Sequence, residues 1–217
     1  MKKARIEITG FTARFYDAIV LVGTAGLYQG MLKTVIAEME IKPEDRILDL
    51  GAGTGKNACL MRANLSHKGN ITAIEIGKEM MTQFKRKCGK YDNVVLSEQR
   101  IEEELPFENE FDKVLLSFVI HGFHQKLREG ILKNAFKALK TDGKIFIFDW
   151  NEIHLKEQGP LFRLFMRTVE CPEARDFIRQ DLKKMLACTG FLDMKESFFA
   201  RGKIRLLTAR KAKGTLP

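Results

Sequence analysis

Residues 45–58 read DRILDLGAGTGKNA, a short apolar run that ends in Asp49 and is followed by glycines at positions 51, 53 and 55. An apolar run of this length, bounded by glycines, is typical of a buried strand that opens into a turn. Glycines at such a turn let the backbone approach a ligand closely, as in the loops that bind nucleotides in many α/β sheets. The stretch therefore predicts a nucleotide-binding loop.

The chain around this loop alternates between strand and helix patterns. Strands are predicted over 46–50, 70–76, 93–98, 111–118 and 144–150, and helices over 56–65, 78–88 and 124–140. Such alternation is typical of a parallel sheet with helices on both faces. Further helical segments are predicted over 161–170 and 175–188. Two final strands, joined by a turn at Arg201–Gly202, are too close in sequence to pair in parallel, so they predict an antiparallel hairpin.

The N-terminal part of the chain precedes this alternating region. Apolar residues at helical spacing between Thr12 and Glu40 predict two or three short helices. We expect one domain over 1–217, with a helical lid over 1–42, a core over 43–217, and a segment on the substrate side over 151–175.

Composition narrows the class of protein. The 217 residues are 45% hydrophobic and include 16 Phe, which is enough for a full core. No stretch approaches the roughly 18 to 20 apolar residues of a membrane span, and the N-terminus lacks the pattern of a signal peptide. The four cysteines form no CxxC pair and have no histidine at ligand spacing, so we expect reduced thiols, no metal site and a cytoplasmic protein.

The net charge of +9 raises the question of a polyanionic partner. Most of the positive charges are interspersed with apolar residues on predicted helix faces, and only the C-terminal residues 201–214 form a cluster. Solvated surfaces explain this distribution better than a nucleic-acid site does. Nucleic acid is therefore not expected as a partner, nor is stable insertion into a membrane.

Two known nucleotide-binding motifs can be compared with the glycine loop. A phosphate-binding GxxxxGK[ST] loop does not fit, because Asn57 follows the GK pair and position 50 is Leu. A dinucleotide GxGxxG loop fails at its last position, which is Lys56. The pattern present is DxGxGxG. The carboxylate of Asp49 would repel a pyrophosphate but would suit a ligand with an ammonium group, although Lys56 could still serve a phosphate.

A second carboxylate strengthens this interpretation. Glu75 ends the second predicted strand, 20 residues after Gly55. A carboxylate at this place accepts hydrogen bonds from ribose hydroxyls in nucleotide-binding sheets. Ile76 and Met80 are then placed to enclose an adenine. A ligand with an amino-acid end, a ribose and an adenine is S-adenosylmethionine.

With these residues the sequence resembles a known family, the class I S-adenosylmethionine-dependent methyltransferases, and especially the ubiquinone/menaquinone C-methyltransferases. The resemblance rests on ILDLGAGTG, AIEIGKEMM, LPFENEFDKVLLSFVIHGF and ALKTDGKIFIFDW, in that order along the chain. It extends weakly to ARFYDAIV and to the closing hairpin. The family has a seven-stranded, mostly parallel Rossmann-like α/β sheet with helices on both faces and a C-terminal antiparallel hairpin, which agrees with the pattern above.

The resemblance implies a cofactor site for S-adenosylmethionine and its product S-adenosylhomocysteine. The glycine loop would lie against the methionine portion, Asp49 would hold its amino group, and Glu75 would hold the ribose. Ser117 and Phe118 would border the sulfur. Tyr16 would cover the site. The complete predicted set is Tyr16, Asp49, Gly51, Ala52, Gly53, Thr54, Glu75, Ile76, Met80, Arg100, Ile101, Ser117 and Phe118.

One part of this set departs from the family pattern. The family usually has Asp-Ala before LPF, where Asp accepts a bond from the adenine amino group. This chain has Arg100 and Ile101 there, and a guanidinium cannot accept a hydrogen bond. We therefore expect a contact from the Ile101 backbone, with Gln99 as a possible replacement for the missing acceptor.

Methyl transfer needs alignment of donor and acceptor, exclusion of water, and removal of a proton if the acceptor carries one. His121 follows the fourth strand and is a candidate general base, while packing or hydrogen bonding at a helix start is the alternative role. Asp149 ends the fifth strand and is either a second catalytic residue or a cap. We expect a small-molecule acceptor and a monomer or homodimer. An RNA or other nucleic-acid methyltransferase and a non-catalytic cofactor-binding module are the alternatives.

Overall fold

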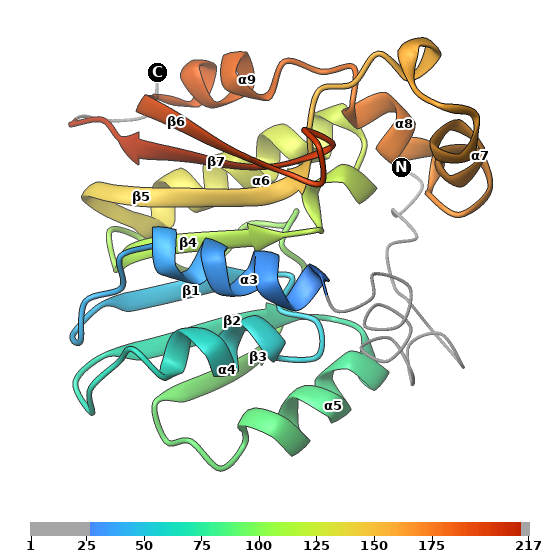
Figure 1. The fold of residues 1–217 in the computed structure, drawn as a ribbon. Coiled ribbons are helices and arrows are strands. Elements are labelled where there is room, and N and C mark those ends of the chain that lie inside the picture. Colours follow the sequence, from blue (N-terminus) through green and yellow to red (C-terminus); the bar gives the residue numbers. More distant parts are fainter. Residues whose placement is uncertain (1–26, 214–217) are drawn as a thin grey trace.

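The apolar runs predicted as strands all lie in one seven-stranded sheet. The computed structural model describes residues 27–213. The strand order is β3–β2–β1–β4–β5–β7–β6 (Figure 1). The strands are β1 Arg46–Leu50, β2 Asn70–Glu75, β3 Val94–Glu98, β4 Phe111–Ser117, β5 Leu139–Trp150, β6 Phe191–Phe199 and β7 Ile204–Lys211. Strands β1 to β5 pair in parallel, and β7 is antiparallel to both of its neighbours. The predicted fold class is confirmed.

Helices cover both faces of the sheet (Figure 1). One face carries α3 Leu27–Glu38, α4 Lys56–Arg62 and α5 Lys78–Cys88, and the other carries α6 Gln125–Ala138 and α9 Leu182–Thr189. The central strands are mostly apolar because both of their faces are covered. In β1, for example, Ile47, Leu48 and Leu50 are fully buried.

A third group of short elements lies beyond the carboxyl ends of the parallel strands. These are the 3-10 turns η1 Ile120–Gly122 and η2 Leu155–Glu157, and the helices α7 Pro160–Thr168 and α8 Pro172–Phe177 (Figure 1). Ligands of open α/β sheets bind at this edge, so these elements surround the place where a substrate would lie.

The single helix predicted over 175–188 is wrong, because the structure has two helices there, α8 and α9. Pro172 occupies the first turn of α8, where a missing N–H costs nothing. Asp181 then starts α9 by accepting a hydrogen bond from the backbone N–H of Lys184 at 2.8 Å. The helix predicted over 124–140 also ends two residues early, at Ala138, because Leu139 already pairs with Phe111 of β4.

The prediction of four reduced thiols is wrong for two of them. Cys59 of α4 and Cys88 of α5 form a disulfide, with Cα atoms 6.2 Å apart, while Cys171 and Cys188 are free. The two bonded cysteines are 29 residues apart on neighbouring helices, so no short sequence motif predicts the pair.

The predicted N-terminal helices are described only from Leu27, where α3 begins. Tyr16 and the rest of residues 1–26 lie outside the described residues, so the predicted lid stays a prediction. Over residues 27–213, none of the helices has the length and apolar character needed to cross a membrane.

Candidate active site

The glycine loop turns sharply from β1 into α4. Gly51, Gly53 and Gly55 all have left-handed φ angles, of 77°, 54° and 82°. A Cβ atom at Gly51 would lie only 2.5 Å from Cγ2 of Val119, which follows β4. This position therefore needs glycine both for its backbone angle and for the close approach of the next strand's loop.

The loop is fastened to the end of β2. The backbone N–H groups of Gly51 and Ala52 both donate to the carbonyl of Ile74, each at 3.0 Å. The N–H of Gly53 donates to Oε2 of Glu75 at 2.9 Å. Predicted cofactor residues from two strands are thereby brought together, although the contacts that they would make with a ligand stay predictions.

Glu75 is fixed at the carboxyl edge of the sheet by three backbone donors. Besides Gly53, the N–H groups of Ile76 and Gly77 donate to Oε1 at 2.8 and 2.7 Å. A carboxylate has about four acceptor positions, so capacity remains for ribose hydroxyls. The geometry agrees with the role that the family resemblance implies for Glu75.

Asp49 is the most unusual group of the site. It is fully buried, and neither carboxylate oxygen has a hydrogen-bond partner among the described residues. Burial, followed by repulsion from Glu75, raises the pKa of Asp49 to about 7. Buried polar groups nearly always have partners, and an unpaired buried carboxylate is costly. A cation such as the ammonium group of an amino acid would relieve this cost.

The adenine end of the predicted site borders a pocket of about 450 Å³, lined by Ile76, Lys78, Glu98, Gln99, Arg100, Glu103 and Glu104. Arg100 donates to Glu102 at 2.6 Å, so its guanidinium is held by a neighbouring carboxylate. Nε2 of Gln99 donates to Ser97 at 2.7 Å, which leaves the amide oxygen of Gln99 as an acceptor on this wall. Met80, Ile101 and Thr54 are all buried, in positions that border the loop and this wall.

The end of β4 supplies the predicted neighbours of the methyl donor. The Ser117 hydroxyl is buried without a partner among residues 27–213. Phe118 has a left-handed φ of 51°, a strained conformation for a non-glycine residue that is often found at functional sites. Its ring lies among other aromatic rings, with centroids 5.8 Å from Tyr28, 5.1 Å from Phe148 and 5.8 Å from Trp150.

His121 and Asp149 form a hydrogen-bonded pair above these rings. Nδ1 of His121 lies 2.7 Å from Oδ1 of Asp149, and the backbone N–H of His121 donates to Oδ2 at 3.3 Å. Because the carboxylate can only accept, Nδ1 carries the proton and Nε2 is left as the acceptor in the neutral imidazole. Asp149 is almost completely buried and also accepts from the N–H of Trp150 at 2.7 Å. These hydrogen bonds fix the Asp149 carboxylate, and the carboxylate in turn fixes the His121 ring.

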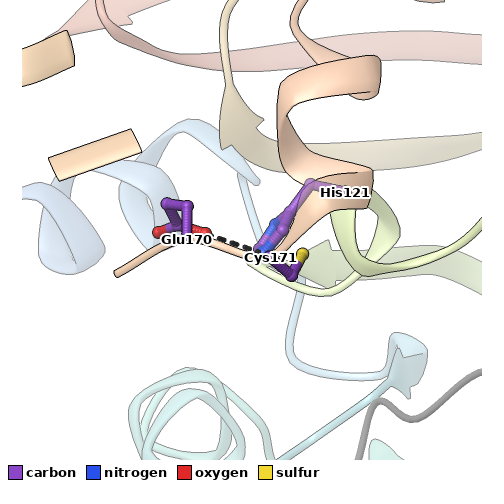
Figure 2. A group of neighbouring side chains, drawn as sticks. All are labelled: His121, Glu170 and Cys171. Carbon is purple, nitrogen blue, oxygen red and sulfur yellow. Dashed lines mark ion pairs between the residues drawn. The ribbon is translucent and has the colours of Figure 1, made fainter. Parts of the chain in front are cut away.

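Sequence reasoning missed two residues at this end of the site. Oε2 of Glu170 lies 3.8 Å from Nε2 of His121, and Cys171 follows directly. One coordinating atom from each of His121, Glu170 and Cys171 lies within 4.8 Å of the others (Figure 2). The segment between α7 and α8 carries Glu170 and Cys171 across the sheet edge, and no motif in the sequence signals that approach.

The electrostatics of this group follow from burial and from opposite charges. Burial lowers the pKa of His121, but Asp149 and Glu170 outweigh it, so the pKa lies above its usual value. Burial raises the pKa of the Glu170 carboxyl, an effect that His121 opposes, and burial also raises the pKa of the Cys171 thiol.

Arg128 of α6 holds the two segments that carry these side chains. Its side chain has no exposed area, and Nη1 pairs with Asp176 at 2.7 Å. Nη2 donates to the carbonyls of His121 at 3.3 Å and Glu173 at 2.8 Å. One buried guanidinium therefore fixes η1 against α8, which makes Arg128 a positioning residue that the sequence did not reveal.

Comparison with known proteins shows which families this chain resembles. Residues 47–143 match the family described as "Methyltransferase domain". The ubiquinone/menaquinone biosynthesis C-methyltransferase UbiE of Xanthomonas campestris pv. campestris is 27% identical over 164 residues, which cover 72% of this chain and 62% of that protein. The chain thus matches about three fifths of the length of this relative.

Solved structures share the fold. A SAM-dependent methyltransferase from Aquifex aeolicus superposes with a TM-score of 0.63 at 19% identity, covering 82% of this chain and 88% of that one. A phosphoethanolamine N-methyltransferase 2 from Haemonchus contortus, in complex with S-adenosyl-L-methionine, gives 0.64 at 15% identity over 80% of this chain and 50% of that one.

The match over residues 47–143, the curated relatives and the fold make this chain similar to class I S-adenosylmethionine-dependent methyltransferases. Within that class it resembles the ubiquinone/menaquinone C-methyltransferases. Asp49 offers an unpaired, buried carboxylate beside the loop that Glu75 holds, and the assignment of these residues to S-adenosylmethionine stays a prediction.

Proposed function

We propose that this protein transfers a methyl group from S-adenosylmethionine to a small-molecule acceptor, quinone-like, lipid-like or another metabolite. The observation that carries the proposal is the buried, unpaired carboxylate of Asp49 beside the glycine loop and Glu75. An ATP or NAD site would place phosphates against this loop, where two carboxylates would repel them. An aminoacyl nucleoside supplies a cation for Asp49 and hydroxyls for Glu75.

The acceptor side supports a small and partly apolar substrate. The rings of Phe118, Trp150, Phe162 and Phe165 form a connected series, with neighbouring centroids 5.8 to 6.3 Å apart. His121 and Asp149 supply the polar end. Two relatives are named as C-methyltransferases of ubiquinone/menaquinone biosynthesis, which supports a quinone-like acceptor.

His121 and Asp149 are the proposed catalytic pair. Asp149 fixes the imidazole so that Nε2 faces the space that the acceptor would enter, and a proton on the acceptor can pass to that nitrogen as the methyl group arrives. The acceptor's lone pair forms the new bond to carbon, and the electrons of the old carbon–sulfur bond stay on the sulfur of S-adenosylhomocysteine. Asp149 acts through His121 rather than on the substrate.

The proposal also covers the location, oligomeric state and domain organisation of the enzyme. We place it in the cytoplasm as a monomer or homodimer, with 1–42 as a lid and 151–175 on the substrate side of a single domain. The Cys59–Cys88 disulfide is unusual for that compartment.

The direct experiment supplies methyl-labelled S-adenosylmethionine with a panel of quinols, phenols, thiols and amines, and with total RNA in a parallel reaction. Label in one small-molecule class is the expected result. Label in RNA, with binding that weakens steeply as salt is added, would instead support the nucleic-acid alternative. Cofactor binding without transfer to any acceptor class or to RNA would favour a binding module.

A further inference from the structure

The group formed by His121, Glu170 and Cys171 has a composition that ion pairing alone does not explain. Imidazole nitrogen, carboxylate oxygen and thiol sulfur are the three kinds of side-chain atom that zinc binds in proteins. One such atom from each residue lies within 4.8 Å of the others, and His121 comes from a different part of the chain than the adjacent Glu170 and Cys171 (Figure 2).

The hydrogen bond on the far side of His121 is the second observation. Nδ1 is bound to Asp149 at 2.7 Å, which directs the free Nε2 toward Glu170 and Cys171. A carboxylate behind a histidine is the arrangement that orients metal-bound imidazoles and raises their basicity. Here the carboxylate is itself buried, so it can do this without competition from water.

The supporting scaffold is rigid on both sides of the group. Arg128 donates to the carbonyl of His121 and to that of Glu173, two residues after Cys171. A site whose supporting residues are locked by buried hydrogen bonds needs little reorganisation when an ion enters. Ligand atoms around tetrahedral zinc are about 3.3 to 3.8 Å apart, given bond lengths of about 2.0 to 2.3 Å. Separations of up to 4.8 Å would therefore shorten by about 1.5 Å at most.

We propose that His121 Nε2, the Glu170 carboxylate and the Cys171 thiolate bind one divalent ion of the zinc class, with a fourth position open to the methyl acceptor. Three protein ligands and one open position are typical of catalytic zinc. Cys171 loses its proton to solvent when the ion binds. The ion's charge also offsets the carboxylates of Asp149 and Glu170, which lie on either side of His121.

The role of the ion rests on the proposed methyl transfer. An acceptor X–H at the open position gives its proton to solvent, because a bound dication lowers the pKa of its ligands. The lone pair left on X then forms the bond to the methyl carbon, and the carbon–sulfur electron pair remains on S-adenosylhomocysteine. In the loaded protein His121 is a ligand, and it acts as a base only when the ion is absent. A thiol or phenol is the acceptor class that benefits most.

The test measures metal directly and does not depend on an acceptor. The full-length protein is stripped with chelator, incubated with zinc or cobalt(II), freed of excess metal, and assayed for metal content. We expect about one ion per chain, and a sulfur-to-cobalt charge-transfer band from Cys171. Cys171→Ser should abolish the band, Glu170→Gln should weaken retention at least tenfold, and Cys188→Ser, which alters an exposed free cysteine, should change neither.

Two results would overturn the metal proposal. One is retention well below one ion per chain in the unsubstituted protein, and the other is equal retention by Cys171→Ser. In either case His121 and Glu170 form only an ion pair. Calorimetry with S-adenosylhomocysteine on the same samples separates the two proposals. Cofactor binding without metal binding removes only the ion, whereas absence of cofactor binding removes the methyl-transfer proposal as well.

Discussion

The cofactor side and the acceptor side of this site are built in opposite ways. On the cofactor side, Asp49 is buried with no partner among the described residues, while the loop around it is fastened by backbone bonds to Ile74 and Glu75. On the acceptor side, His121 and Asp149 bind each other, and Arg128 fastens the chain around them. The buried carboxylate of Asp49 on the cofactor side has no charge partner among residues 27–213, whereas the buried carboxylate of Asp149 on the acceptor side is paired with His121.

This difference indicates how specificity is divided. A cofactor shared by a whole class can be held by backbone geometry and one unpaired charge, since its structure does not vary. An acceptor that varies from protein to protein needs side chains on segments that can change, such as η1 and the residues between β5 and α8. If specificity is divided in this way, a substitution on one side should leave the function of the other side unchanged.

The largest effect should come from the acceptor side alone. His121→Asn removes the imidazole nitrogen proposed as the base and should lower kcat by about 10²- to 10⁴-fold, while the affinity for S-adenosylhomocysteine stays nearly unchanged. Single-turnover methyl transfer and calorimetry give the two quantities. His124→Asn is the matched control, because that side chain is 66% exposed. Loss of cofactor affinity in His121→Asn would show that the two sides are coupled.

The next effect belongs to the cofactor side. Glu75→Ala removes the acceptor expected for both ribose hydroxyls and the partner of the Gly53 N–H, and should weaken cofactor binding by about 2 kcal/mol, roughly 30-fold. Glu44→Ala removes the same charge at the opposite edge of the sheet, where Glu44 pairs with Lys68 on the surface, and should have no effect. Unchanged affinity in a folded Glu75→Ala protein would end the assignment of the ribose site.

A pH dependence should mark the unpaired carboxylate. Folding raises the pKa of Asp49 from 3.8 to about 7, so the folded free protein binds this proton more tightly than the unfolded chain. Ionisation of Asp49 therefore lowers the free energy of unfolding more and more as pH rises from about 4 to 7. The cofactor's ammonium group needs the carboxylate form, so affinity for S-adenosylhomocysteine should fall about tenfold per pH unit below 7 and level off above it.

Asp49→Asn should remove that pH dependence. The variant should bind the cofactor weakly at every pH, yet at pH 8 the free protein should be more stable by roughly 1 to 3 kcal/mol, because a buried unpaired charge is gone. Thermal unfolding without ligand measures the gain. A variant that is both weaker in binding and less stable would mean that Asp49 has a structural role in the free protein.

The smallest effects should separate two glycines of one loop. Gly51→Ala imposes a strained backbone and a contact with Val119, so it should lower stability by about 1 to 3 kcal/mol. Gly53→Ala has open space around it and should cost only the backbone strain, about 1 kcal/mol. Urea unfolding gives both values. Equal losses would show that the close approach of the loop after β4 does not matter to the fold.

The cofactor side could be predicted from the sequence because its residues lie in continuous motifs. Asp49 ends a strand, the glycines follow it directly, and Glu75 ends the next strand, so local pattern and sheet topology place them together. The strands β1 to β4 were predicted to within a residue or two for the same reason. The side-chain orientation of Arg100 could not be predicted in this way, because it depends on the hydrogen bond to Glu102 and no sequence pattern specifies that bond.

The acceptor side could be predicted only in part. His121 and Asp149 were found because His121 follows β4 and Asp149 lies near the end of β5, and the carboxyl ends of these parallel strands meet at one edge. Glu170 and Arg128 were not, because their contacts with His121 depend on how α7, α8 and η1 cross that edge. The Cys59–Cys88 pair was missed for a similar reason, since packing of α4 on α5 brings the two residues together.

The central claim is that Asp49, Glu75 and the glycine loop form a site for S-adenosylmethionine. Titration calorimetry of the protein with S-adenosylmethionine, S-adenosylhomocysteine, NAD and ATP at pH 8 tests it most directly. We expect one site per chain for the first two ligands, with affinity lowered about 30-fold in Glu75→Ala, and no detectable binding of the last two. Binding of NAD or ATP at this site, with no heat from S-adenosylmethionine or its product, would contradict the account.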